Sequence, residues 1–351
     1  MTAVRLSPAR QTLNVALLAA VTLGGLYYVK WSPYWTKAVF AAGHHALGAS
    51  ILTGKAALPP AASWSAALAY GIAYGKAIWQ ALVLGLLVGS GVQALLPANA
   101  IAKALGGRGF GGALAGGLLA VPGMMCTCCA APVVAGLRRQ QASAGAALAF
   151  WLGNSVLNPA TLVFIGFVLG WKWTALRLAL GLPMVFGLGY LANRLTRPNE
   201  AEAARAALAD PEASTREGVF GRWLRLLAGM SLRLVPEYAL LVLLLGASRA
   251  WLFPVIGPEV GNTAGWVLAF AVAGAVFVIP TAGEVPIIQA MLALGVRAGP
   301  AGALLMTLPP ISLPSMAMLA RAFPPRVLAA VGAMVVLFGL AGGALAIALR
   351  F

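Results

Sequence analysis

The sequence is poor in charged residues and rich in apolar ones. Only 9% of its 351 residues are charged and 61% are hydrophobic, whereas soluble globular domains contain about 25% charged residues. The mean hydropathy is +0.90. This composition excludes an ordinary soluble globular protein and predicts an integral membrane protein.

Acidic residues are the scarcest charged type. Eight Asp and Glu residues stand against 24 Lys and Arg, which gives a net charge of +16. The basic residues lie singly or in pairs at the ends of apolar segments, where they mark membrane topology and meet anionic lipid headgroups. We therefore expect the lipid bilayer as a partner and no nucleic acid.

The sequence has no nucleotide-binding motif. Transport driven by ATP hydrolysis within this chain is therefore excluded. We expect no cofactor and no enzymatic activity.

Only three cysteines occur, Cys126, Cys128 and Cys129, all within "VPGMMCTCCAAPVVAGLRR" at residues 121–139. An odd number in one cluster cannot form a disulfide framework, so these residues are expected to be free thiols. A zinc site would need a fourth ligand, and the His44–His45 pair is far away in sequence. We predict no metal site.

Long apolar windows dominate the chain, and several approach the roughly 20 residues that a bilayer-spanning helix needs. The fold class expected is an all-α polytopic membrane protein. An N-terminal window lacks a clear cleavage site and is interpreted as an uncleaved first helix. The windows are residues 15–29, 77–97, 145–170, 238–253 and 327–349.

One long polar segment, residues 193–233, contains five of the eight acidic residues. Its arginine excess predicts a cytoplasmic, partly helical loop. The loop divides the chain into an N-terminal helix with an external or interfacial segment (1–70), a first permease repeat (71–192), the loop (193–233) and a second permease repeat (234–351).

The two halves share proline landmarks. Pro132 is followed 27 positions later by Pro159, and Pro286 is followed 28 positions later by Pro314. The stretch "VPGMMCTCCAAPVVAGL" also aligns with "IPTAGEVPIIQAML". We interpret this similarity as an ancient duplication.

Basic residues favour an inverted arrangement of the halves. If residues 110–137 crossed the membrane once, Arg138 and Arg139 would lie opposite Lys103 and Arg108, against the positive-inside bias. A re-entrant hairpin removes the conflict. We therefore predict two inverted repeats, each with three spans plus a re-entrant or broken-helix hairpin, and an extra N-terminal helix. This topology places four lysines outside, namely Lys30, Lys37, Lys55 and Lys76.

Each half is expected to break a helix at membrane depth, where unsatisfied backbone groups require a protein- or water-lined cavity. A solute site would form where the two breaks meet. The alternative is that these prolines only kink spanning helices. The break residues are Pro122, Gly123 and Pro132 in the first half and Pro280, Gly283 and Pro286 in the second.

Glu284 is the acidic residue flanked on both sides by long apolar sequence. A carboxylate at that depth is costly and is by default a proton carrier, a cation ligand or a substrate partner. The alternative is a structural acid paired with a neighbour such as Arg297. Glu237 is expected at an interface.

Three interpretations of Cys126, Cys128 and Cys129 remain open. The thiols could serve only as small packing residues. They could bind a thiophilic species such as trivalent arsenic, Cu(I) or reactive sulfur, since a C-x-C-C run at a helix break can direct several sulfurs into one cavity. They could also act in redox sensing.

Other polar residues near the breaks are candidates for the same cavity. Asn154, Ser155 and Asn158 precede Pro159 on one helical face, and Thr281 and Ser312 are their counterparts in the second half. Interhelical hydrogen bonding is the alternative role. His44 and His45 are expected at the membrane surface. Spacings such as Gly85/Gly89 and Gly112/Gly116 predict packing seams.

The stretch "CTCCAAPVVAGLRRQQASAGAALAFWLGNSVLNP" resembles the cysteine-containing signature of the predicted-permease family that includes the ArsP-type organoarsenical efflux permeases. The stretch "PTAGEVPIIQAMLALGVRAGPAGALL" resembles the second-half signature of that family, and together they cover 60 residues. Two positions depart from the pattern: Gln141 replaces a usual turn glycine, and Ser155–Val156 stands where many members have a proline.

The resemblance implies a multi-pass permease of the cytoplasmic (inner) membrane that exports trivalent organoarsenicals through its cysteine region. It places Cys126, Cys128, Cys129, Pro132, Gly136, Asn158 and Pro159 in the first signature, and Gly283, Glu284 and Pro286 in the second.

The primary hypothesis is efflux of a thiophilic solute, with Glu284 coupling protons or completing the pocket. The alternatives are a permease for another small anion or sulfur species, and a membrane thiol redox protein. Association into a homo-oligomer is left open.

Overall fold

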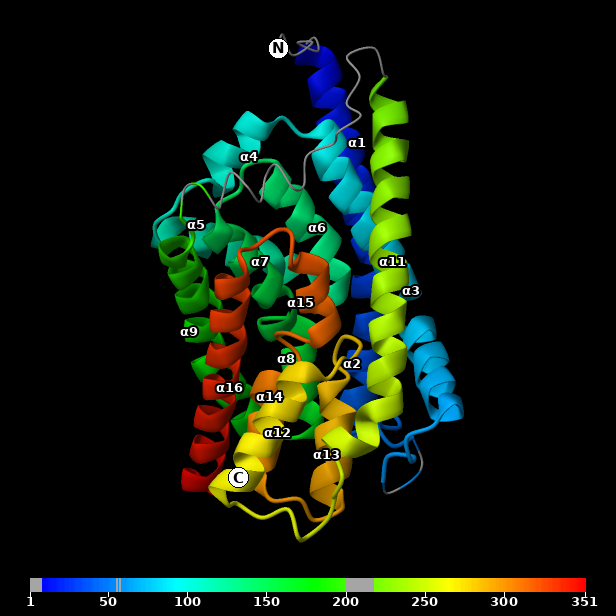
Figure 1. Ribbon diagram of the computed structural model, residues 1–351, viewed down its shortest axis with the longest axis vertical. Coiled ribbons are helices and arrows are strands. Elements are labelled where there is room, and N and C mark those ends of the chain that lie inside the picture. The colour runs from blue at the N-terminus through cyan, green and yellow to red at the C-terminus, as the bar shows by residue number, and fades with distance from the viewer. Residues whose placement is uncertain (1–7, 55, 57, 198, 200–217) are drawn as a thin grey trace.

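The computed structural model describes residues 8–54, 56, 58–197, 199 and 218–351 (Figure 1). Within these ranges the regular structure is helical, and the single β-bridge joins Ser50 and Gly54. The helices are α1 (Pro8–Leu26), η1 (Tyr27–Trp31), α2 (Ser32–His44), α3 (Trp64–Leu95), α4 (Ala98–Leu105), α5 (Phe110–Ala120), η2 (Val121–Gly123), α6 (Thr127–Arg139), α7 (Ala144–Val156), α8 (Pro159–Val168), α9 (Trp171–Leu195), α11 (Val219–Leu252), α12 (Ala264–Val276), α13 (Glu284–Ala293), α14 (Ala298–Thr307), α15 (Leu313–Leu319) and α16 (Pro325–Ala348).

Six helices in the described part of the chain are long and apolar enough to cross a membrane, and the bent pair α4/α5 could add a seventh. The predicted all-α polytopic membrane fold is therefore confirmed. The six are Thr12–His44, Trp64–Leu95, Ala144–Val168, Trp171–Leu195, Val219–Leu252 and Pro325–Ala348.

Apart from α4 and η2 of the first half, the described helices of the two halves follow the same order. A long helix (α3 or α11) is followed by two short helices around a break (α5 and α6, or α12 and α13). An interrupted helix then follows (α7 and α8, or α14 and α15), and a long helix (α9 or α16) closes each half. The breaks predicted from proline and glycine lie at residues 121–126 and 277–283.

Corresponding long helices run in opposite directions. In Figure 1, α3 rises toward the end where α4 lies, and α11 descends from it. In the first turn of α9, Trp173 packs against Phe351, the residue toward which α16 runs. The last turns of α9 lie where Arg108 donates a hydrogen bond to the Asn193 carbonyl.

Two predicted domain boundaries fall inside helices. Helix α3 starts at Trp64 and crosses the 70/71 boundary, and α11 starts at Val219 and crosses the 233/234 boundary without interruption. The described start of the second half therefore lies inside the segment assigned to a loop. Most of the remaining loop, including the alanine-rich stretch at 201–209, lies outside the described residues.

Two of the predicted break prolines do not break a helix. Pro132 lies inside α6, and Pro286 lies in the first turn of α13. A first-turn proline costs little because the N–H groups of that turn have no intrahelical acceptor. The four residues that do lie at the breaks are Pro122, Gly123, Pro280 and Gly283.

Glycines bring α3 and α6 into backbone contact. A Cβ atom on Gly85 would lie 2.1 Å from the Cys129 carbonyl oxygen, and one on Gly89 would lie 2.5 Å from the Pro132 backbone. Close backbone approach of this kind is how membrane helices pack without a hydrophobic force. The Gly85/Gly89 spacing is a packing seam, as expected, and it fixes the position of the helix that bears the thiols.

The loop between α6 and α7 explains one departure from the family signature. Gln141 has φ +69°, in the left-handed region that favours glycine. Ser143 follows it as the N-cap of α7 and accepts a hydrogen bond from the Ala146 N–H at 3.1 Å.

Candidate functional site

The three thiols meet at the first break. Cys126 is the extended N-cap residue of α6, and the first turn of the helix brings Cys129 back beside it. The Cys126 and Cys129 sulfurs are 2.9 Å apart, and the Cys126 and Cys128 sulfurs are 3.5 Å apart. All three are free and buried, so the C-x-C-C spacing does direct its sulfurs to one point.

Two phenols from the long helices reach the thiols. The Tyr74 hydroxyl on α3 lies 3.2 Å from the Cys128 sulfur and donates to the Ile279 carbonyl at 3.3 Å. The Tyr238 hydroxyl on α11 donates to the Tyr74 hydroxyl at 2.6 Å. This hydrogen-bonded chain connects the thiols with the backbone of the second break.

A buried lysine reaches the second break from the N-terminal helix. Lys30 lies in the π-helical turn η1 and donates to the Thr281 hydroxyl at 3.1 Å and to the Tyr34 hydroxyl at 3.3 Å. It is 4% exposed. Lys30 was expected in an external segment, but it lies within the candidate span Thr12–His44 and its side chain is buried. Lys55 lies outside the described residues.

One small cavity joins the two breaks. It is lined by Cys126 and Thr127 from the first break and by Pro280, Thr281 and Glu284 from the second. Its volume of about 10 Å³ has room for about one water molecule. One thiol of the cluster, Cys126, and the buried acid Glu284 thus line the same cavity.

Glu284 is paired with an arginine that the sequence analysis did not select. The Arg177 guanidinium on α9 lies 3.5 Å from Glu284 Oε1, and both side chains are almost fully buried. Glu284 Oε2 has no hydrogen-bond partner among the described residues. The proposed structural partner Arg297 is wrong, since that exposed residue lies at the turn before α14.

Arg177 also donates to three backbone carbonyls. Its acceptors are Ser155 at 3.0 Å, Val156 at 3.1 Å and Leu305 in the second half. A single charged side chain therefore ties α7, α9, α13 and α14 together around the cavity. A lone arginine inside an apolar window was a sequence signal for this role, because charge at that depth is rarely incidental.

The remaining predicted polar residues have other contacts. Asn154 donates to the Phe150 carbonyl at 2.8 Å, and its Oδ1 lies 3.4 Å from the Met125 N–H at the first break. Asn158 caps α8, and Ser312 caps α15 in a capping box. None of these three lines the shared cavity, whereas Ser155 does. Their contacts are those of packing and capping.

Gly123 is required by this packing. A Cβ atom there would lie 2.3 Å from Asn154 Oδ1. The carbonyl of the preceding Pro122 accepts a 2.8 Å hydrogen bond from the Trp31 indole. The N-terminal helix, whose purpose the sequence left unexplained, therefore braces both breaks.

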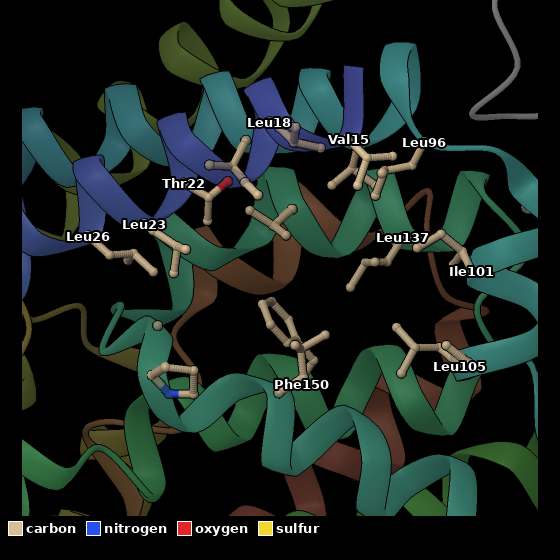
Figure 2. A pocket seen from close by; sticks show the side chains of 18 of the residues that line it. Val15, Leu18, Thr22, Leu23, Leu26, Leu96, Ile101, Leu105, Leu137 and Phe150 are labelled. Carbon is tan, nitrogen blue, oxygen red and sulfur yellow. The ribbon is translucent and has the colours of Figure 1, made fainter. Parts of the chain in front are cut away.

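A larger, apolar cavity of about 640 Å³ lies between α5 and α6 (Figure 2). Leu23 and Leu26 of α1 line one wall, and Phe150 of α7 lines another. At one end the cavity closes on Pro122, Gly123 and Met125 of the first break. Hydrocarbon surface therefore extends to the residue before Cys126.

Within the described part of the chain, no group of three His, Cys, Asp or Glu side chains is arranged to hold a metal ion.

The comparisons with known proteins agree with this architecture. The profile of the predicted-permease family ArsP_1 matches residues 63–347. The chain is 51% identical over 332 residues to the UPF0718 protein YraQ of Escherichia coli strain K12, which covers 95% of this chain and 94% of that protein. No solved structure matches the chain. This multi-pass membrane protein therefore belongs to the predicted-permease family.

Proposed function

We propose that this permease exports a thiophilic solute, for which a trivalent organoarsenical is the candidate, and that Cys126, Cys128 and Cys129 bind it. The carrying observation is the meeting of three free, buried thiols at one break, beside a cavity shared with Glu284. Thiolates are soft ligands suited to soft, thiophilic species.

The apolar cavity supports a solute with an organic substituent. An inorganic ion gains no free energy from the hydrocarbon lining of this 640 Å³ cavity. An alkyl or aryl group does, because burying its apolar surface there removes it from water. The substituent would occupy this space while its soft centre contacts the thiols.

Movement of the solute is proposed to follow the alternating-access scheme of inverted repeats. The opposed directions of α3 and α11, and of α9 and α16, favour this interpretation (Figure 1). So does the reciprocal packing of α6 on α15 and of α13 on α8. Glu284 would carry a proton or complete the pocket, and the protein would reside in the cytoplasmic (inner) membrane.

The transport test uses everted membrane vesicles and a trivalent phenylarsenical. Cys126→Ser, Cys128→Ser and Cys129→Ser, singly and together, should reduce accumulation. Ala130→Ser is the matched control, because it adds a hydroxyl to the same buried helix and keeps all three sulfurs. Unchanged transport in the triple variant would show that the cysteines do not bind the solute.

A second candidate is a permease for a small anion or sulfur species. The buried cations Lys30 and Arg177 favour it, because the described surroundings of the cavity contain only Glu284 as a balancing acid. Comparing thermal stabilisation by sulfur oxyanions and by arsenicals separates the two candidates. A membrane thiol redox protein instead predicts thiol oxidation and turnover without solute movement.

A further inference from the structure

A second space lies at the far side of the second break, and its mostly apolar lining includes a few polar side chains. This vestibule has a volume of about 600 Å³ and is covered by the connection between α2 and α3. Ser50 and Thr53 of that connection line it, together with Tyr70 of α3 and Arg249 of α11. It lies at the end of α11 opposite to α4 (Figure 1).

Arg249 enters the vestibule, and none of the described residues is its hydrogen-bond or ion-pair partner. The residue is 7% exposed, its Nε has no hydrogen-bond acceptor, and no described residue forms an ion pair with it. Its recorded contact is with the face of the Tyr70 ring, 5.3 Å from the guanidinium carbon. A buried guanidinium with no acceptor is costly, so an acceptor arriving from outside the protein would be bound favourably.

The lining of the vestibule suits an anion. Arg249 is the one charged side chain among the described lining residues, and no carboxylate opposes it. The Ser50 and Thr53 hydroxyls add hydrogen-bond donors. A guanidinium presents its N–H groups in the planar fork that matches an oxyanion.

Pro280 lines both the vestibule and the small cavity that contains Cys126 and Glu284. The two spaces therefore meet at Pro280 of the second break. We propose that Arg249 binds a small oxyanion in this vestibule, in the last chamber before the side of the membrane opposite to α4. The chamber's place on a transport route rests on the proposed function, but anion binding by Arg249 does not require the thiols.

The test measures anion binding by the full-length protein in an uncharged detergent. Sodium sulfate is the probe, sodium chloride at equal ionic strength is the reference, and the readout is the melting temperature. Wild type should show a saturable increase specific to sulfate. Arg249→Gln should weaken the apparent affinity by roughly tenfold or more, as expected for loss of a charged hydrogen bond.

Lys172→Gln is the charge-matched control, since this exposed residue begins α9 outside the vestibule. Thr53→Glu provides a second test if Arg249→Gln fails to fold. It places a carboxylate at a half-buried position of the vestibule lining, where the carboxylate would repel a sulfate ion. It should abolish the sulfate response.

Three results would overturn the assignment. They are a wild-type response no larger with sulfate than with chloride, an unchanged sulfate affinity in Arg249→Gln or Thr53→Glu, and stabilisation by short-chain phosphatidylglycerol but not by sulfate. The last result would identify a lipid headgroup site. Retention of the sulfate response by the triple cysteine variant would separate this site from the thiol mechanism.

Discussion

Cys128 has the most specific surroundings of the three thiols. It contacts both the Tyr74 hydroxyl and the Cys126 sulfur, at 3.2 and 3.5 Å. Tyr74→Phe should keep the fold, because the ring and its packing remain, and should change the reactivity of Cys128. Thiol labelling of the variant under denaturing and native conditions checks both statements; identical native labelling rates in wild type and Tyr74→Phe would show that the phenol has no influence.

Arg177 and Glu284 make unequal contributions to stability. Arg177→Met would leave the Glu284 carboxylate buried without its partner and free three carbonyls, so the expected loss is about 3–5 kcal/mol. Glu284→Gln keeps an acceptor for Arg177 and should lower the melting temperature less. Thermal unfolding in detergent orders the two variants, and the reverse order would contradict this account.

Some residues of the site can be predicted from the sequence, and others cannot. Glu284 and the cysteines stand out because charge and sulfur are rare in this chain. The tyrosines of the site do not stand out, because the chain has seven tyrosines and a tyrosine ring is largely apolar. Pairing Arg177 with Glu284 needs four helices in place, and no spacing rule connects positions 107 residues apart.

At the scale of the helix, the α3/α6 seam determines where the thiols lie. Gly85→Ala places a methyl group against the Cys129 carbonyl and should destabilise the protein by about 1–3 kcal/mol. Gly75→Ala on the same helix is the control, since a Cβ there meets nothing within 4 Å. Alanine also favours the helix, so Gly75→Ala should be neutral or slightly stabilising. Equal melting temperatures for the two variants would contradict the close packing of α3 against α6 at Gly85.

The apolar cavity supports a second prediction about elements. Leu23→Trp on α1 adds volume to the cavity wall at a half-exposed position and should partly fill the space (Figure 2). Transport of a phenylarsenical should decrease more than transport of inorganic arsenite. A parallel decrease of both, measured in vesicles with equal amounts of protein, would argue against a role for the cavity.

Hydropathy and proline spacing predicted most elements but not their details. The apolar windows correspond to spanning helices. Both breaks lie between pairs of short helices, where Pro-Gly and Pro-Thr-Ala-Gly sequences interrupt the helical backbone. Pro132 was misassigned because α6 continues through it. Lys30 was expected in an external segment because a lysine at the end of an apolar window usually extends to the membrane surface, whereas its side chain is buried and donates to the Thr281 hydroxyl.

For the whole molecule, the proposed inverted topology predicts which side of the membrane each loop faces. Lys103 and Arg297 are both exposed and lie at opposite ends of the molecule, near α4 and at the α13–α14 turn (Figure 1). Single cysteines at these positions, in a background without Cys126, Cys128 and Cys129, should react with an impermeant reagent from opposite sides. Labelling of both from one side would refute the topology.

The central claim is that the three thiols at the first break bind the solute. X-ray absorption at the arsenic edge of the purified full-length protein, loaded with phenylarsine oxide, tests it most directly. We predict sulfur neighbours around arsenic in wild type and in Ala130→Ser, and their loss in the triple Cys→Ser variant. Arsenic bound by the wild type with only carbon and oxygen neighbours would contradict the account.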